Sequence, residues 1–236
     1  MNVVPKLFIA IDQNDINKAK ELIQKLPSQM CGIKVGKELF TACGPEIIQW
    51  IQEKGFKVFL DLKYHDIPNT VEKACFVASK MGVSILNVHA LGGIDMMLAA
   101  KEGVDKSNNN PYLIAVTLLT SMDSDGLKSI GFTSNVNKQI LNLAKSASQA
   151  KMDGIVCSAK DIVNIKDVLP EKFLYVTPGI RLSTSAKDDQ KRISSPLEAI
   201  KSGSNILVIG RPITQAKNPE AVLNEIMDDI SKTIDV

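Results

Sequence analysis

The sequence predicts an α/β fold of the (β/α)8 barrel type, built as a single domain over residues 1–236. Short apolar runs alternate with amphipathic stretches along the chain, and no Ser/Pro-rich or low-complexity segment interrupts them. Short, uniformly apolar runs are typical of parallel strands that are covered on both faces. Eight strand–helix units in 236 residues also fit the usual size of such a barrel, about 250 residues.

The expected strands are short and rich in Val, Ile and Leu. They cover residues 7–11, 32–35, 58–62, 85–88, 113–118, 154–157, 174–176 and 206–209. Helical patterns lie between them, including residues 16–26, 45–53, 70–81, 137–152, 162–169 and 219–234. The last pattern begins at Asn218-Pro219, which is a helix-start signal with proline in the first turn. Gly92-Gly93 is interpreted as a turn after the fourth strand.

The amino-acid composition narrows the classes of function that this chain could have. The chain is 44% hydrophobic with a formal net charge of +2, and it lacks the basic runs with interleaved aromatics that nucleic-acid binding favours. No apolar run approaches membrane-spanning length, and the N-terminus lacks the apolar region of a signal peptide. We therefore expect a cytoplasmic protein that binds neither nucleic acid nor membrane. Four scattered cysteines and two histidines make a zinc site or a disulfide framework an unfavoured interpretation.

The segment 61–66, Asp-Leu-Lys-Tyr-His-Asp, is the most informative part of the chain. It follows the apolar run 58–60, so its charges lie where a buried strand reaches the surface. Side chains alternate along a strand, so Asp61 and Lys63 are expected to point the same way, while Asp66 lies beyond the strand end. Paired charges at such a place usually act on a ligand. A purely structural salt bridge between Asp61 and Lys63 is the alternative.

Residues suited to a site lie at or near the ends of most of the expected strands. They are Asp12, Lys34, Asp61, Lys63, His89, Thr120, Ser121, Arg181 and the pair Gly210-Arg211. In a (β/α)8 barrel the carboxyl ends of all strands meet at one rim, where the active site forms. The sequence therefore predicts a site at this rim.

Two segments are suited to a phosphate. Gly210-Arg211 follows the eighth strand, where barrels often hold phosphate through backbone N–H groups and where arginine can bind oxygens in a bidentate manner. The polar stretch 182–192, which includes Gln190, follows the seventh strand. Its length predicts a lid that orders on ligand binding, although a solvated connection is the alternative.

These residues resemble the orotidine 5′-phosphate decarboxylase family. The matching segments are 8–12, 33–36, 61–70, 87–90, 118–121, 176–181, 189–192 and 209–213. They occur in family order, and the long Asp-x-Lys-x-x-Asp block is highly specific. The chain is most similar to the free-standing bacterial form. The resemblance implies decarboxylation of orotidine 5′-phosphate to UMP in pyrimidine biosynthesis, with no cofactor and no metal.

The resemblance also implies the site residues. Lys34, Asp61, Lys63 and Asp66 form the charge network, with Lys63 as the proton donor. The neighbouring subunit of a homodimer supplies Asp66, Ile67 and Thr70. Substrate contacts fall to Asp12, Lys34 and Asp61 near the ribose and reacting ring, Thr120 and Ser121 at the pyrimidine, Pro178 and Arg181 after the seventh strand, and Gln190, Gly210 and Arg211 at the phosphate.

Two other functions remain as alternatives. A metal-dependent sugar-phosphate decarboxylase or aldolase on the same barrel shares the Asp-x-Lys-x-x-Asp pattern, but it places an acidic residue where this chain has Lys34, and a cation there opposes metal binding. A catalytically silent phosphate-binding barrel would not require a buried charged donor such as Lys63. His65 and His89 are interpreted as structural or supporting groups.

Overall fold

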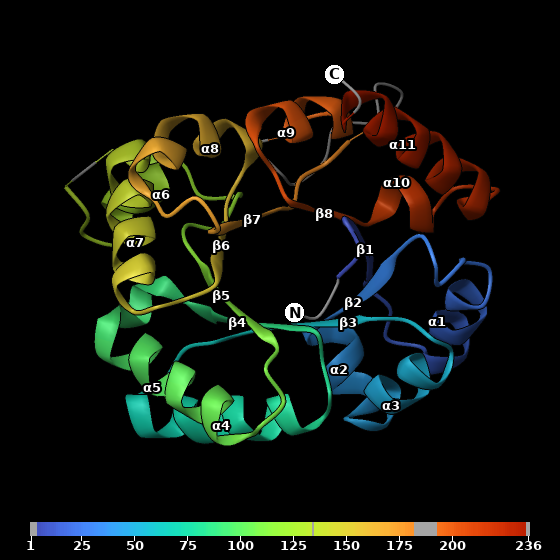
Figure 1. The fold of residues 1–236 in the computed structure, drawn as a ribbon, viewed down its shortest axis with the longest axis horizontal. Coiled ribbons are helices and arrows are strands. Elements are labelled where there is room, and N and C mark those ends of the chain that lie inside the picture. Colours follow the sequence, from blue (N-terminus) through green and yellow to red (C-terminus); the bar gives the residue numbers. More distant parts are fainter. Residues whose placement is uncertain (1–3, 134, 182–192, 235–236) are drawn as a thin grey trace.

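The computed structural model describes residues 4–133, 135–181 and 193–234, and it shows a closed barrel of parallel strands (Figure 1). Each strand pairs with the next along the chain, and β8 pairs with β1 to close the barrel. The helices form a ring outside the strands (Figure 1). The predicted (β/α)8 barrel is therefore confirmed.

The strands lie close to their predicted positions. They are β1 (Leu7–Ile11), β2 (Gly32–Gly36), β3 (Val58–Tyr64), β4 (Ile85–His89), β5 (Tyr112–Val116), β6 (Gly154–Val156), β7 (Leu174–Thr177) and β8 (Ile206–Ile209). The bounds of β1 and β8 agree with the prediction. β3 runs two residues further than predicted, and β5 ends two residues earlier.

The helices include several that the sequence patterns did not specify. The α-helices are α1 (Ile16–Ile23), α2 (Lys37–Cys43), α3 (Glu46–Glu53), α4 (Pro68–Lys80), α5 (Gly93–Lys106), α6 (Ser124–Ser129), α7 (Val136–Gln149), α8 (Ala159–Ile165), α9 (Pro196–Ser202), α10 (Arg211–Thr214) and α11 (Pro219–Ile234). Two 3-10 helices, η1 (Ala90–Gly92) and η2 (Lys166–Val168), complete the set for the described residues. Gly93 has a φ of +85°, as a turn residue would, yet it also begins α5.

The barrel interior is filled by a small apolar cluster separate from the layer between strands and helices. It comprises Phe8, Ala10, Phe59, Ile85, Ile114, Val176, Ile206 and Val208. Phe8 and Phe59 meet edge to face, with ring centroids 5.9 Å apart. A Cβ on Gly32 would lie 2.4 Å from the Phe8 ring, so only glycine fits beside it. Because side chains fill the interior, a ligand is expected to bind at the rim formed by the carboxyl ends of the strands.

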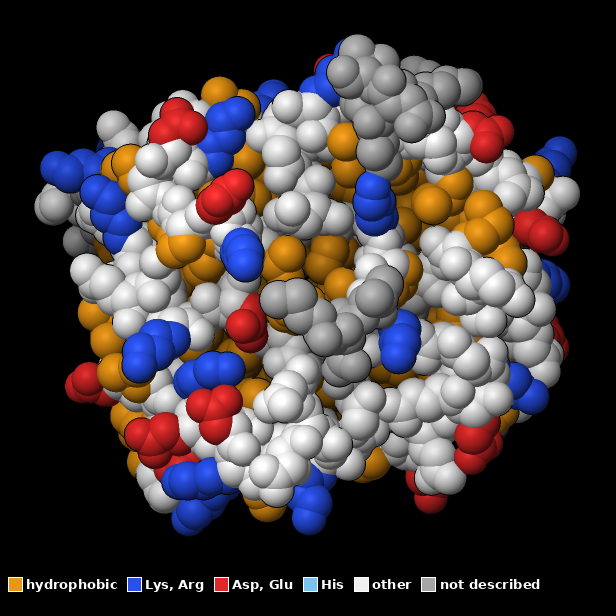
Figure 2. All heavy atoms as spheres, viewed as in Figure 1, with side chains coloured by type: hydrophobic (Ala, Val, Ile, Leu, Met, Phe, Trp, Pro, Cys, Tyr) orange, Lys and Arg blue, Asp and Glu red, His pale blue; other side chains and the backbone are white. Residues whose placement is uncertain are grey.

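Among residues 4–133, 135–181 and 193–234, no helix combines the length and apolar character that a bilayer crossing requires. On the face shown in Figure 2, positive and negative side chains are interspersed around the edge, without a continuous basic region.

Candidate active site

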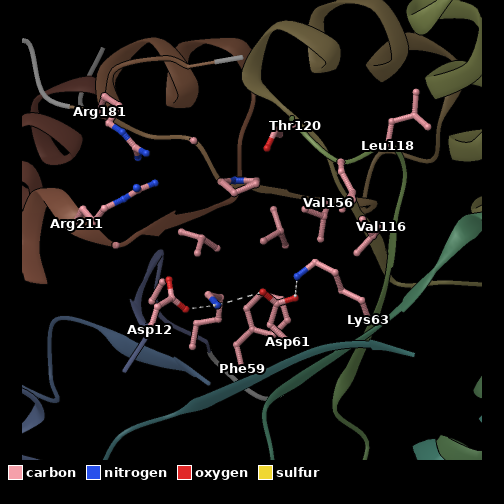
Figure 3. Close-up of a pocket in the computed structure, with 18 residues that line it drawn as sticks. Asp12, Phe59, Asp61, Lys63, Val116, Leu118, Thr120, Val156, Arg181 and Arg211 are labelled. Atoms are coloured by element: carbon pink, nitrogen blue, oxygen red, sulfur yellow. Dashed lines mark hydrogen bonds and ion pairs between the residues drawn. The ribbon is translucent and has the colours of Figure 1, made fainter. Parts of the chain in front are cut away.

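A pocket of about 210 Å³ opens at the carboxyl ends of the barrel strands. Its floor consists of apolar side chains from the strands, among them Phe59, Val116, Val156, Val176 and Val208. Polar side chains stand above this floor, at strand ends or in the loops that follow (Figure 3). Because all the strands are parallel, residues far apart in sequence converge on one small volume.

The structure brings many of the predicted site residues together in this pocket. Those that line it are Asp12, Lys34, Asp61, Lys63, Thr120, Pro178, Arg181, Gly210 and Arg211. Ser121 lies in the same loop as Thr120 but does not line the pocket. Gln190 and the predicted lid, residues 182–192, lie outside the described residues.

Asp66, Ile67 and Thr70 do not line the pocket of their own chain. They follow β3 and lie at the start of α4, where all three are exposed, Ile67 to 65%. The Asp66 carboxylate accepts a hydrogen bond of 2.6 Å from the Ile67 N–H. These residues are therefore accessible at the surface and follow the pocket-lining Lys63 by three to seven positions in the chain.

Four side chains of alternating charge form a continuous line along one side of the pocket (Figure 3). The Lys34 Nζ lies 3.5 Å from Asp12 Oδ1 and 3.2 Å from Asp61 Oδ2. The Lys63 Nζ lies 2.5 Å from Asp61 Oδ1. Two ammonium groups and two carboxylates thus balance each other, with Asp61 shared between both lysines.

Burial gives these contacts their strength, because charges away from water are poorly screened. Side-chain exposure is 10% for Lys34 and 12% for Asp61. Burial alone would lower the pKa of Lys34, but attraction to Asp61 and Asp12 outweighs it and holds that pKa above its ordinary value. Burial would raise the pKa of Asp61, but Lys34, Lys63 and hydrogen bonds from Lys63 and Asn87 hold it below its ordinary value. Both groups are therefore charged near neutral pH.

Gly36 makes room for the pair formed by Lys34 and Asp12. A Cβ at this position would lie 2.9 Å from Lys34 Nζ and 3.3 Å from Asp12 Oδ1. Any larger residue at the end of β2 would push the two charged groups aside. In the sequence alone, Gly36 is only the last residue of the matching segment 33–36, with no sign of this steric role.

Asn87, at the centre of β4, was missed as a functional residue. Its side chain is fully buried, and it donates a 2.7 Å hydrogen bond to Asp61 Oδ1 and accepts one of 2.8 Å from the Lys63 N–H. Within an apolar strand it resembled a core position. The only signal available in the sequence was a polar amide inside a run of buried apolar residues, which requires hydrogen-bond partners.

Arg181 and Arg211 lie on the other side of the pocket from Lys63, and their guanidinium groups point toward the same opening (Figure 3). Arg181 follows β7, and Arg211 begins α10 directly after β8. Arginine binds phosphate oxygens with its planar fork of N–H donors. The pocket is therefore polarised, with a balanced lysine–carboxylate network at one end and cationic groups at the other.

His65 and His89 stack beside this network without lining the pocket, with ring centroids 5.5 Å apart. The His89 Nδ1 accepts a hydrogen bond from the Leu91 N–H at 3.4 Å. Burial, and then the charges of His65, Lys63 and Lys37, lower the pKa of His89 to about 4. His89 is therefore neutral at physiological pH.

No group of three or more His, Cys, Asp or Glu side chains in the described part of the chain is arranged to hold a metal ion. The four cysteines, Cys31, Cys43, Cys75 and Cys157, are all free thiols. Burial raises the pKa of Cys31 and Cys75 to about 12, so both are protonated structural groups.

The barrel and its polarised pocket define an enzyme of the class that acts on small anionic substrates at the carboxyl ends of (β/α)8 strands. Comparison with known proteins makes this specific. Residues 5–226 match the model of the family described as "Orotidine 5'-phosphate decarboxylase / HUMPS family". The chain belongs to this family, as its motifs indicated.

Relatives named orotidine 5′-phosphate decarboxylase are similar over nearly the whole chain. One from Saccharophagus degradans is 50% identical over 228 residues, covering 97% of this chain and 96% of the relative. One from Idiomarina loihiensis is 49% identical over 229 residues, covering 97% and 99%. The crystal structure of orotidine 5′-phosphate decarboxylase from Lactobacillus acidophilus superposes with a TM-score of 0.86 at 35% identity, covering 96% of this chain and 99% of that one.

Proposed function

We propose that this protein converts orotidine 5′-phosphate to UMP and CO₂ in pyrimidine biosynthesis, without a metal or organic cofactor, and that Lys63 donates a proton to C6 of the pyrimidine. The decarboxylase class follows from the family and its relatives. The role of Lys63 rests on one observation above all. Its ammonium group is held 2.5 Å from the buried Asp61 carboxylate, and both residues line the pocket.

The chemistry explains why a fixed ammonium group is needed. When the bond between C6 and the carboxylate carbon breaks, CO₂ leaves and the electron pair stays on C6, in the plane of the ring. The π system cannot delocalise this pair. A nearby ammonium can stabilise it electrostatically and then transfer a proton from Nζ to C6, which completes UMP and leaves a neutral amine. Water then reprotonates the amine.

Asp61 holds the Lys63 ammonium in place for this step, and Lys34 in turn contacts Asp61. The shared carboxylate attracts both ammonium groups and restricts their movement. The substrate carboxylate would also meet Asp61 as a like charge. At about 4 Å and an effective dielectric constant near 20, this repulsion is about 4 kcal/mol before relaxation. Repulsion alone is therefore too small, because enzymes on very slow reactions lower the barrier by roughly 20 kcal/mol.

The phosphate group supplies the remaining stabilisation in this proposal. Arg181 and Arg211 stand at the end of the pocket away from Lys63 (Figure 3), where they can bind a phosphate while C6 faces the ammonium. Binding energy from this remote group can be used to exclude water and align the reacting carbon. Gly210 and Gln190 are proposed to bind the same phosphate, and Thr120 and Ser121 the pyrimidine.

We also propose a homodimer in which each copy completes the pocket of the other with Asp66, Ile67 and Thr70. Their exposure, a few residues after the pocket-lining Lys63, supports this, because an isoleucine exposed to 65% leaves apolar surface for a partner. Mixing inactive Lys63→Ala and Asp66→Asn proteins should regenerate activity, because one site of each hybrid dimer is intact. If subunits exchange and no activity returns, the shared site is wrong.

The assay for the main proposal is formation of UMP from orotidine 5′-phosphate by purified protein in excess EDTA. Undiminished turnover is expected, since β2 places Lys34 in the pocket rather than a metal-binding carboxylate. Dependence on added magnesium would instead favour a metal-dependent sugar-phosphate enzyme. The proposed cytoplasmic location agrees with four free cysteines, because thiols persist in reducing compartments.

A further inference from the structure

The pairing of β3 with β4 is irregular directly below the charge network. Leu60 pairs with Leu86 and Tyr64 pairs with Val88, so a single residue of β4, Asn87, lies opposite three residues of β3. Lys63 is one of those three and has a φ of +54°, a left-handed conformation that residues other than glycine rarely adopt. The backbone that carries Lys63 therefore needs a specific partner to hold it in this form.

Asn87 provides that partner through both ends of its carboxamide. Its Oδ1 accepts the hydrogen bond from the Lys63 N–H at 2.8 Å, and its Nδ2 donates to Asp61 Oδ1 at 2.7 Å. The same Asp61 oxygen is the one that lies 2.5 Å from Lys63 Nζ. The Asn87 amide therefore completes a ring of three contacts. The Lys63 N–H bonds to Asn87, Asn87 bonds to Asp61, and Asp61 contacts the Lys63 ammonium.

The place requires a group that accepts a hydrogen bond on one side and donates one on the other, as a carboxamide does. One side of the position presents a backbone donor and the other presents a carboxylate acceptor, so the group between them must accept on one side and donate on the other. Reversing the amide would place its NH₂ against an N–H and its oxygen against a carboxylate. Asn87 is fully buried, so water cannot replace either hydrogen bond.

We propose that Asn87 is a positioning residue for decarboxylation, which ties the Asp61 carboxylate to the Lys63 backbone and so fixes where the Lys63 ammonium lies. This inference rests on the proposed role of Lys63. Asn87 does not line the pocket, so it acts through Asp61 and Lys63 rather than on the substrate. β4 contributes no residue to the pocket lining, but Asn87 connects this strand to two residues that do line it, Asp61 and Lys63.

The first test is the effect of Asn87→Ala on steady-state kinetics. We expect kcat to fall by about tenfold to a hundredfold, the range for loss of hydrogen bonds to charged groups, while KM changes by less than about threefold. KM is spared because the arginines that bind phosphate lie at the other end of the pocket. Ser204→Ala is the matched control. It removes a buried hydroxyl that bonds Thr177 Oγ1 at 2.8 Å, with no contact to the network, and should leave kcat unchanged.

The second test, Asn87→Asp, separates positioning from a general effect on folding. In its acid form the new carboxyl group can accept from the Lys63 N–H and donate to Asp61, as the amide does. In its ionised form it repels Asp61. We therefore expect kcat of Asn87→Asp to approach the wild-type value at low pH and to fall as one proton is lost, with a limb absent from wild type and from Asn87→Ala.

Either of two results would overturn the inference: kcat of Asn87→Ala within twofold of wild type, or a pH profile of Asn87→Asp without the added limb. Failure of Asn87→Asp to fold at any pH would also contradict it, because the acid form keeps both hydrogen bonds. Lys63→Ala, measured in parallel, separates the two proposals. If Lys63→Ala is inactive and Asn87→Ala is normal, only the positioning role fails; if Lys63→Ala turns over normally, both fail.

Discussion

Replacing Asp61 with asparagine removes the carboxylate that both lysines share. At an effective dielectric constant of 20, its attraction to Lys34 at 3.2 Å and to Lys63 at 2.5 Å is about 5 and about 7 kcal/mol before the cost of desolvation. Desolvation offsets most of this, and removing one partner of a buried ion pair typically costs about 3–5 kcal/mol. We expect Asp61→Asn to lower the free energy of unfolding by that amount.

The same change should slow the reaction, because Lys63 loses its fixed partner. Loss of the hydrogen bonds from Lys63 and Asn87, each to a charged group, predicts a fall in kcat of about 10² to 10⁴. Urea unfolding and UMP formation measure the two effects. Asp105→Asn is the control, since Asp105 lies 3.1 Å from Lys101 but is 59% exposed, and it should cost no more than about 1 kcal/mol with kcat unchanged. Equal, small losses for both variants would refute the reasoning.

Two further predictions concern groups around the pocket. Because the pKa of folded His89 is about 4, only the unfolded chain binds a proton there between pH 6.5 and about 4, so wild type should lose stability as pH falls through this window. His89→Asn should reduce that loss of stability by about 1–2 kcal/mol after allowance for solvent screening. Urea midpoints of wild type and variant at pH 6.5 and at about pH 4 measure the effect. Equal pH dependence of the two proteins would contradict this prediction. Arg211→Ala should lower kcat/KM by about tenfold to a hundredfold, whereas Lys128→Ala, 74% exposed, should not change it. Unaltered kinetics of Arg211→Ala would exclude it from phosphate binding.

The fold was predictable where apolar runs end abruptly. β1 and β8 are bounded as expected because Asp12 and Gly210 follow them directly. β5 was predicted too long because buried apolar residues continue beyond the ladder, where Leu118 lines the pocket instead of pairing. α5 was missed because Gly92-Gly93 marks a turn, and the helix begins at the second of these glycines.

The position of the rim residues followed from parallel topology, but their mutual contacts did not. Alternation along a strand predicted that Asp61 and Lys63 share a face, and both line the pocket. The left-handed Lys63 residue lies within the register shift, and its N–H donates to Asn87, which is 24 residues away in sequence. Such a long-range contact leaves no local pattern, so sequence periodicity could not reveal it.

Turnover by Lys63→Ala, with and without an added small primary ammonium ion, tests the central claim most directly. Loss of the general acid and of electrostatic stabilisation together predicts a fall in kcat of at least about 10⁴, with partial recovery when the ammonium ion occupies the vacated space. Turnover near the wild-type rate, unaffected by the added ion, would contradict the account.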